Sequence, residues 1–373
     1  MRIALVTEFY YPHLGGITEH VHNLAAHFRR WGHEVVIITS RVAGDTAERE
    51  GVEYVGRSRV VYANGSFARF TSGLRVGSRI AEILRRERID MVHVHGGLAP
   101  RLGMVAPRVA GRLGIPSVAT FHSWFPQSVT YRLFGPYFQR ELDRLSARIA
   151  VSEPVVRAFS RYFAAPWEII PNGVDVSDFH PNGRRPMERT GRPMLLFLGR
   201  LDPRNGLDTI LGAMPAVLAR HPGAELVVVG DGPLRSHYER KAEPLGRAVR
   251  FVGKVLEERT SYYAHSDIYV CPTERASFGI TLLEAMACGT PMLVSDIIGF
   301  RELVDGGAEA GLVSPGDPAA WARSVSDLLD EPLRRVRMGL AGREKAMLFS
   351  WDRIAERVFA LYEQVLGRRK VEA

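Results

Sequence analysis

Short apolar runs alternate with amphipathic stretches along the whole chain. The first run, Arg2–Thr7, predicts a buried strand, and the glycine-containing loop Tyr10–Gly16 follows it. Apolar residues then recur at helical spacing from Val21 to Phe28, and the next apolar run is Val35–Thr39. A strand, a loop, a helix and a second strand form a βαβ unit, so we expect a parallel sheet.

The alternation restarts after a break in the second half of the chain. Residues Phe179–Pro193 are rich in proline, glycine and arginine, which is typical of a linker or surface loop. Further apolar runs predict strands on both sides of it, at Ile89–Val94, Ser117–Thr120, Arg148–Val151, Met194–Leu198, Glu225–Val229 and Val249–Val252. With 373 residues the chain is also long for one core. We therefore predict an α/β protein with two doubly wound domains.

The segment Thr273–Thr290 combines a turn of small residues with an apolar helix. It follows the predicted strand Ile268–Val270, and its helical pattern stops at Gly289, since glycine is favoured just after a helix. A strand, a small-residue turn and a helix direct free backbone N–H groups at an anion. Glu284 lies inside the helix, where a carboxylate is suited to accept hydrogen bonds from sugar hydroxyls. An ordinary βα unit with an exposed glutamate is the alternative.

Three histidines fall on or just after predicted strands. His93 and His95 alternate along one strand, so they share a face and could ligate a metal. No third ligand is apparent in the sequence, so we expect a structural role and no metal site. His122 follows the strand Ser117–Thr120, and the carboxyl ends of parallel strands line the ligand crevice. His122 is therefore a site candidate, with a structural histidine as the alternative.

The composition is that of a soluble globular protein, with 46% hydrophobic and 24% charged residues. No apolar run approaches the ~20 residues that span a bilayer. The N-terminus enters a strand and meets Glu8, so we expect no signal peptide. Cys271 and Cys288 give no disulfide framework, which fits a reducing cytoplasm.

The net charge of +8 lies entirely in the first half of the chain. Residues 1–171 hold 22 Arg, no Lys and 14 acidic residues, whereas the remaining 27 basic and 27 acidic residues cancel. A basic half indicates an acidic partner, such as nucleic acid, anionic lipid or a phosphorylated substrate. The sequence contains no helix-turn-helix, zinc ligand set or RNP-like aromatic strand, so we expect no nucleic-acid partner.

Five motifs occur in an order that characterises one enzyme family. They are Gly15-Gly16, Asn172–Asp175, Gly199-Arg200, Gly230–Pro233 and Ser277–Gly289. In this order they resemble the retaining family-4 glycosyltransferases of GT-B fold over essentially the whole chain. The resemblance implies two Rossmann-like domains facing across a cleft, with the nucleotide-sugar donor on the C-terminal domain and the acceptor on the N-terminal domain. In this family the last helix crosses back to the first domain, which gives domains of 1–171 plus 352–373 and 172–351.

Three further segments are similar to those of the bacterial phosphatidylinositol mannosyltransferases within this family. They are Tyr62–Arg69, Thr120–Ser123 and Arg148–Ser152. In those enzymes the first segment meets the polar head of the acceptor lipid, and the histidine of the second contacts the transferring sugar. The resemblance implies an acceptor site formed by Tyr62, Asn64, Ser66, Arg69, His122 and Ser123. It also implies GDP-mannose as the donor, with a UDP-sugar as the alternative, an anionic inositol phospholipid as the acceptor, and no tightly bound cofactor.

The resemblance also assigns roles in the donor site. Arg200, the amides of Phe278–Ile280 and those of Gly15-Gly16 would stabilise the charge that grows on the leaving diphosphate. Glu284 would bind the ribose hydroxyls, and Lys254 lies where the family contacts the base. The donor set is Gly15, Gly16, Arg200, Arg204, Asn205, Gly230, Lys254, Glu274, Ser277, Phe278, Gly279, Ile280 and Glu284, and the catalytic set is His122, Arg200 and Glu284. The family has no clear enzyme nucleophile, so we name no general base.

Two departures from the family pattern bear on activity. The family usually has a lysine in the loop after Gly-Arg, where this chain has Asn205 preceded by Arg204. It also has a glutamate eight residues before Glu284, where this chain has Ala276, and Glu274 lies two residues too early. Loss of one such group costs on the order of 10²–10³-fold in rate. The alternatives are therefore an impaired scaffold protein that binds nucleotide or lipid, and a transferase acting on a soluble sugar or sugar phosphate.

Two arginine-rich stretches in the first half predict contact with a membrane surface. A helix over Gly73–Arg88 would carry three arginines on one face: Arg75, Arg79 and Arg86. A second set is likewise spaced by four: Arg140, Arg144 and Arg148. Solvated arginine faces are the alternative, but basic residues gain about 1 kcal/mol each near an anionic surface. We therefore expect a peripheral protein at the cytoplasmic face of the cell membrane.

Overall fold

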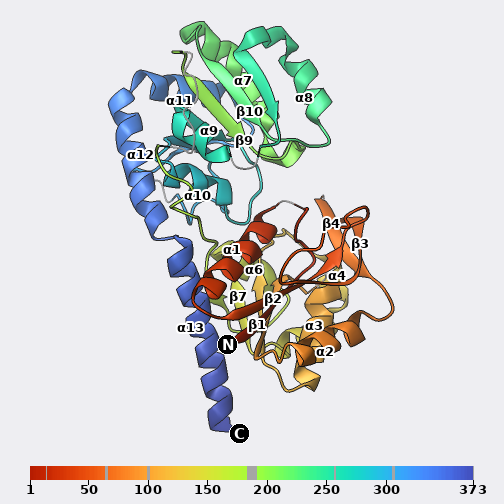
Figure 1. The fold of residues 1–373 in the computed structure, drawn as a ribbon. Helices are drawn as coiled ribbons and strands as arrows, with labels where there is room; N and C mark the ends of the chain where they lie inside the picture. The colour runs from red at the N-terminus through yellow and green to blue at the C-terminus, as the bar shows by residue number, and fades with distance from the viewer. Residues whose placement is uncertain are drawn as a thin grey trace. The chain divides into compact units, whose positions relative to one another are not determined.

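The computed structural model describes residues 1–13, 15–63, 66–98, 101–182, 191–255, 258–304 and 307–372. The chain forms two compact units, which Figure 1 draws as a ribbon. Unit 1 contains Met1–Asn172 and Trp351–Ala373, and unit 2 contains Gly173–Ser350. Each boundary lies within one residue of the position that the sequence predicts.

An eight-stranded sheet forms the centre of unit 1, in the order β4-β3-β2-β1-β5-β6-β7-β8. The strands are β1 (Arg2–Thr7), β2 (Glu34–Arg41), β3 (Val52–Ala63), β4 (Ser66–Ser72), β5 (Met91–Gly96), β6 (Ser117–Phe121), β7 (Ala147–Ala150) and β8 (Glu168–Ile169). The helices are α1 (Gly16–Arg30), α2 (Val76–Arg86), α3 (Arg101–Arg112), α4 (Val129–Leu133), α5 (Gly135–Asp143), α6 (Glu153–Ser160) and α13 (Trp351–Glu372). The connection from β1 through α1 to β2 runs toward one edge of the sheet, and the connection from β5 through α3 to β6 runs toward the other edge. Because such crossovers are right-handed, α1 and α3 lie on opposite faces of the sheet.

The strands β3 and β4 form an antiparallel hairpin that the sequence-based elements do not contain. Their register runs from the pair Arg57 and Ser72 to the pair Ala63 and Ser66. All other neighbouring strands of unit 1 pair in parallel. The hairpin lies at the edge of the sheet, where an antiparallel pair can have one face in water. It therefore lacks the continuous apolar run that marks the buried parallel strands.

A six-stranded, entirely parallel sheet forms the centre of unit 2, in the order β11-β10-β9-β12-β13-β14. The strands are β9 (Met194–Leu198), β10 (Glu225–Val229), β11 (Val249–Gly253), β12 (Ile268–Cys271), β13 (Met292–Ser295) and β14 (Gly311–Val313). The helices are α7 (Leu207–Arg220), α8 (Arg235–Ala242), α9 (Arg259–His265), α10 (Ile280–Ala287), α11 (Pro318–Asp330) and α12 (Pro332–Met347), with short 3-10 helices at Pro203–Asn205 and Glu243–Ala248. Both units are doubly wound α/β sheets, so the predicted fold class is confirmed.

The C-terminal helix α13 belongs to the core of unit 1. Its residues Trp351, Ile354 and Tyr362 are buried in one cluster with Phe28 of α1, and Figure 1 shows the two helices side by side. The rings of Phe28 and Tyr362 have centroids 5.6 Å apart. The Tyr362 hydroxyl also hydrogen-bonds to Nδ1 of His93 on β5, at 2.5 Å. The last helix thus packs against the first unit, as the family resemblance implies.

The helices bear on the expected membrane contact in two ways. In the described part of the chain, no helix is both long and apolar enough to cross a bilayer. The second arginine set does not form a helix face, because α5 ends at Asp143 and Arg148 lies in β7. The guanidinium of Arg148 donates to the carbonyl oxygen of Leu142 at 2.8 Å, and burial lowers the pKa of Arg148. Arg148 therefore does not share an exposed face with Arg140 and Arg144, which are both exposed.

Replacing Ile354 by alanine should destabilise unit 1, because this side chain is only 1% exposed in the core. Such substitutions cost about 2–5 kcal/mol in the free energy of unfolding. Urea unfolding followed by tryptophan fluorescence measures the change. The control is Glu356→Ala on the exposed side of the same helix, which should change the free energy by less than about 0.5 kcal/mol. Equal stability of the two variants would contradict the packing of α13 in this core.

Candidate active site

The strand order of unit 2 reverses between β9 and β12, and the loops after these two strands meet. The N–H of Glu274, after β12, donates to the carbonyl oxygen of Arg204, after β9, at 2.9 Å. Gly206 closes the first loop with φ of 71°, and a Cβ there would come within 2.1 Å of the Pro272 carbonyl oxygen. Ligands of open α/β sheets bind at such a reversal, so this edge is the candidate donor site.

Gly230 allows the loop after β10 to pack against the loop after β9. Its φ is 137°, and a Cβ at this position would lie 1.9 Å from the carbonyl oxygen of Gly199. Its N–H donates at 2.8 Å to the carbonyl oxygen of Gly253, which precedes the exposed Lys254. The predicted donor residues Arg200, Gly230 and Lys254 therefore come from neighbouring strand ends.

The loop after β9 carries two arginines and an asparagine. Arg200 and Arg204 each lie 3.9 Å from the carboxylate of Asp202, and their side chains are 41% and 51% exposed. The amide Nδ2 of Asn205 donates to the carbonyl oxygen of Arg200 at 2.7 Å. Asn205 thus holds the shape of the loop, whereas Arg200 and Arg204 supply its positive charge.

Glu284 is buried on α10, so the exposed-glutamate alternative is wrong. Its side chain is 5% exposed. Arg259 Nη1 lies 3.0 Å from Oε1, and the hydroxyl of Tyr263 donates to Oε2 at 2.9 Å. Burial and the negative charge of Glu284 raise the pKa of Tyr263 well above its usual value. The carboxylate is therefore fixed in position by two donors from one helix.

Arg259 and Tyr263 were not singled out from the sequence. They are four residues apart on α9, the helix that leads into β12, so both side chains can reach the same carboxylate. This spacing is the signal that could have found them. The predicted segment Ser277–Ile280 lies at the start of α10, which begins just after Gly279 with φ of 132°. The positive end of that helix dipole therefore lies at the carboxyl end of β12.

The strand order of unit 1 reverses between β1 and β5, and four histidines gather there. His20 comes from α1, His93 and His95 from β5, and His122 from the residue after β6. The ring of His20 has its centroid 5.2 Å from that of His95 and 4.8 Å from that of His122. Nδ1 of His95 lies 3.4 Å from Nε2 of His122. The sequence did not single out His20, although it lies four residues before Leu24 on the apolar face of the predicted helix.

Hydrogen bonds orient two of these rings. Nδ1 of His20 lies 2.9 Å from Oδ1 of Asn172, an oxygen that can only accept, so Nδ1 carries the proton. His93 has both nitrogens engaged, Nδ1 with the Tyr362 hydroxyl at 2.5 Å and Nε2 with the Thr120 hydroxyl at 2.7 Å. His93 therefore has the structural role that the sequence predicted for it.

Burial keeps all four imidazoles neutral at pH 7. It lowers the pKa of His20 to about 4. Burial, together with the charges of neighbouring histidines, holds the pKa values of His93, His95 and His122 well below the usual value. His122 is partly exposed, whereas the other three are buried.

The other predicted acceptor residues are spread over unit 1. Ser123 is exposed next to His122, whereas Gly15 and Gly16, which were predicted for the donor site, lie at the start of α1. The backbones of Tyr62 and Ser66 lie in the β3–β4 hairpin, and Asn64 falls outside the described residues. Arg69, on β4, donates to the hydroxyl of Ser58 on β3 at 3.1 Å, and burial lowers the pKa of Arg69. Among the described residues, no hydrogen bond or ion pair joins Arg69 to the histidines.

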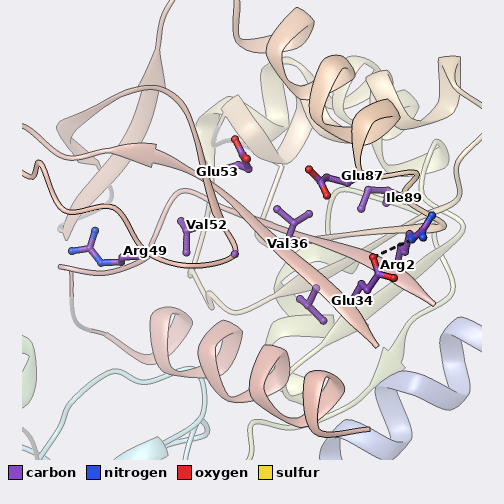
Figure 2. Close-up of a pocket in the computed structure, with 10 residues that line it drawn as sticks. Arg2, Glu34, Val36, Arg49, Val52, Glu53, Glu87 and Ile89 are labelled. Carbon is purple, nitrogen blue, oxygen red and sulfur yellow. Dashed lines mark hydrogen bonds and ion pairs between the residues drawn. The ribbon is translucent and has the colours of Figure 1, made fainter. Parts of the chain in front are cut away.

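A pocket of about 330 Å³ lies at the amino ends of the unit 1 strands, away from the histidines at their carboxyl ends. Figure 2 shows its lining, including Arg2 and Glu34 at the amino ends of β1 and β2. These two side chains form an ion pair at 3.1 Å. Because ligands of such sheets bind at the carboxyl ends of the strands, this pocket is not part of the candidate active site.

Family models match both halves of the chain. The model described as Glycosyltransferase Family 4 covers residues 14–178, and the model described as Glycosyl transferases group 1 covers residues 192–331. The chain belongs to the family-4 glycosyltransferases of GT-B fold.

Known relatives agree with this assignment. The chain is 33% identical to a phosphatidyl-myo-inositol mannosyltransferase of Propionibacterium freudenreichii, over 97% of this chain and 94% of the relative. It is 29% identical to a glycogen synthase of Mycobacterium tuberculosis, over 97% and 94% of the two chains. The solved structure of Anabaena HepE in complex with UDP is similar in fold, with a TM-score of 0.76, 17% identity, and coverage of 98% and 100%.

Proposed function

We propose that this chain is a retaining mannosyltransferase that moves mannose from GDP-mannose to the inositol head of an anionic phospholipid. It would act as a peripheral protein on the cytoplasmic face of the cell membrane. The mannosyltransferase relative supports the sugar and the acceptor. The observation that carries the donor site is the buried carboxylate of Glu284, fixed by Arg259 and Tyr263.

In the proposed reaction an acceptor hydroxyl attacks the anomeric carbon on the face from which the nucleotide diphosphate departs. The new C–O bond forms as the bond to the diphosphate breaks, and the diphosphate oxygen keeps the electron pair. The acceptor proton passes to that oxygen, so the configuration is retained without an enzyme nucleophile. Arg200, Arg204 and the start of α10 would stabilise the growing negative charge, and Glu284 would accept hydrogen bonds from the ribose hydroxyls.

Glu284→Ala should weaken nucleotide-sugar binding by about 1.5–3 kcal/mol, because buried ribose hydroxyls lose a charged acceptor. Calorimetry with GDP-mannose, UDP-glucose and ADP-glucose measures the change in affinity and shows which nucleotide base the donor site prefers. Glu284→Gln keeps the side-chain volume and should also weaken binding, whereas the exposed Glu243→Ala in the same unit should not. Unchanged affinity in both Glu284 variants would exclude this residue from the donor site. No binding of any of the three nucleotides by the wild-type protein would contradict the donor proposal as a whole.

An impaired, ligand-binding scaffold is the second candidate function, because Asn205 and Ala276 depart from the family pattern. Asn205 is engaged within its own loop. The backbone at Ala276 is tightly packed, since a Cβ on Gly299 would lie 2.0 Å from the Ala276 carbonyl oxygen. Glu274 is exposed, and its backbone is hydrogen-bonded to the loop of Arg204. Glu274 is therefore an exposed carboxylate close in sequence to Ala276, the position where the family has a glutamate.

The double substitution Ala276→Glu and Asn205→Lys restores the family pattern. If the lack of these two groups weakens the site, this variant should turn over about tenfold faster or more. Turnover is measured as transfer of radiolabelled mannose to phosphatidylinositol. The uncharged pair Ala276→Gln and Asn205→Met is the matched control and should give no gain. A double variant no faster than this control would favour the scaffold function.

The structure changes which arginines are available to meet a lipid surface. On α2, Arg79 and Arg86 already form ion pairs with Glu53, Glu82 and Glu87. Much of the basic charge predicted for this helix face is therefore neutralised within the protein.

A second set of exposed residues lies on the adjacent hairpin and the turn after it. This hairpin patch consists of exposed basic and apolar side chains: Arg57, Arg59, Phe70, Leu74 and Arg75. Leu74 is fully exposed, and Phe70 is 40% exposed. Apolar side chains next to arginines are suited to a bilayer interface, where the former enter the headgroup region and the latter meet anionic phosphates. The hairpin patch is therefore the proposed docking surface.

The chain should bind liposomes containing phosphatidylinositol or phosphatidylglycerol, bind neutral phosphatidylcholine little, and be released by high salt. Changing Arg57, Arg59 and Arg75 to glutamine should reduce binding roughly a hundredfold, at about 1 kcal/mol per arginine. The matched control makes the same change at three exposed arginines of unit 2: Arg240, Arg247 and Arg250. Co-sedimentation measures the binding. Equal binding to both liposome types, or none to either, would favour a soluble sugar or sugar phosphate as the acceptor, in line with the glycogen synthase relative.

A further inference from the structure

Three of the four clustered histidines in unit 1 have ring nitrogens close to one another. His20, His95 and His122 each offer one nitrogen, and these atoms all lie within 4.8 Å of one another. The residues come from α1, β5 and the end of β6, so the fold, and not the local sequence, assembles the group. The sequence-based expectation of no metal site depended on the lack of a third ligand beside His93 and His95. The structure brings His20 and His122 beside His95.

The spacing of the nitrogens agrees with that of ligands on one small ion. Two nitrogens bound at 2.0–2.1 Å to a tetrahedral ion lie about 3.3–3.4 Å apart. Nδ1 of His95 and Nε2 of His122 are already 3.4 Å apart. All three nitrogens lie within 4.8 Å of one another, so binding of one ion requires a small shift of the rings toward each other.

The group also contains a buried nitrogen that has no hydrogen-bond partner within the described residues. Nε2 of His20 is in this state, on a residue that is 1% exposed. A buried polar atom without a partner is costly, so its presence indicates a missing ligand, ion or water. Because Asn172 accepts from Nδ1 of His20, the lone pair of that ring is on Nε2. Metal-binding histidines typically have such a second hydrogen bond, which fixes the ring and its tautomer.

We propose that His20, His95 and His122 bind one divalent transition-metal ion of the zinc class through three neutral imidazoles. Three nitrogen ligands select zinc, cobalt, nickel or copper and not magnesium or calcium, which prefer oxygen. A fourth coordination position is left for water, and the partly exposed His122 gives the ion a route from solvent.

The site has a consequence for the reaction that depends on the proposed function. His122 is the residue expected to contact the transferring sugar, and its nitrogen cannot hold a metal ion and a sugar hydroxyl at once. Zinc at this site is therefore an inhibitor of sugar transfer and not a cofactor. Metal binding itself requires no substrate, so it can be tested separately from the transferase activity.

The experiment uses the untagged, metal-stripped full chain and measures zinc affinity by competition with a chromogenic chelator. We expect one tight zinc ion per chain, unaffected by excess magnesium. His20→Gln, His95→Gln and His122→Gln should each weaken zinc binding by at least about tenfold. Two controls should keep the wild-type affinity: His93→Gln, whose ring nitrogens already have partners, and the exposed His237→Gln in unit 2.

Cobalt substitution of the wild-type protein tests the geometry without any variant. A strong visible absorption typical of tetrahedral Co²⁺ supports the three-histidine site, and its loss on addition of zinc shows that the two ions share it. Weak octahedral absorption, or equal zinc affinity in the wild type and in folded His20→Gln and His122→Gln variants, would overturn the proposal. Inhibition of transfer by zinc in the wild type but not in His20→Gln would support the consequence for the reaction. If zinc binds and the protein has no transferase activity, the site stands and the proposed function fails.

Discussion

Parallel strand pairing is the constraint on which both candidate sites depend. A parallel pair needs a crossover that returns the chain to the same end of the sheet, so the carboxyl ends of the strands gather at one edge. Where the strand order reverses, the loops on either side leave in opposite directions and open a crevice. Arg200 and Glu274 lie near that reversal in unit 2, and His95 and His122 lie near it in unit 1. The two units thus place very different chemistry at equivalent positions of similar sheets.

Burial acts on these two groups in opposite ways. Glu284 lies in the interior as an anion because a guanidinium and a phenol donate to it. The four histidines of unit 1 lie in the interior as neutral rings, because desolvation disfavours their charged form. Unit 2 therefore has one fixed carboxylate, Glu284, in the same unit as the positively charged loop of Arg200 and Arg204. Unit 1 has a set of neutral imidazoles whose nitrogen lone pairs can accept hydrogen bonds or bind a cation. Sugar hydroxyls can hydrogen-bond to either arrangement, whereas a soft cation favours the second.

The sequence predicted those features that follow from local pattern. The cap at Gly289, with φ of 67°, and the helix that carries Glu284 were predicted, because a short apolar helix and its glycine stop are local signals. Arg259 and His20 were missed, because each gains its meaning from a contact across more than twenty residues of sequence, with Glu284 and with His122. The β3–β4 hairpin was missed since an edge pair with one solvated face has no continuous apolar run. The arginine spacing suggested one basic face, but Arg148 lies in β7 and not with Arg140 on α5, because periodic spacing does not show where a helix ends.

The placement of α13 has a consequence for how the protein is made. Unit 1 is interrupted in the chain, with unit 2 inserted between residue 172 and residue 351. During synthesis from the N-terminus, unit 2 is complete before the last segment of unit 1 leaves the ribosome. Until then the surface of α1 that receives Trp351 and Tyr362 is uncovered, and His93 lacks the phenol that bonds to it. The core of unit 1 is therefore incomplete, and accessible to chaperones and proteases, until α13 has been synthesised and packs against α1.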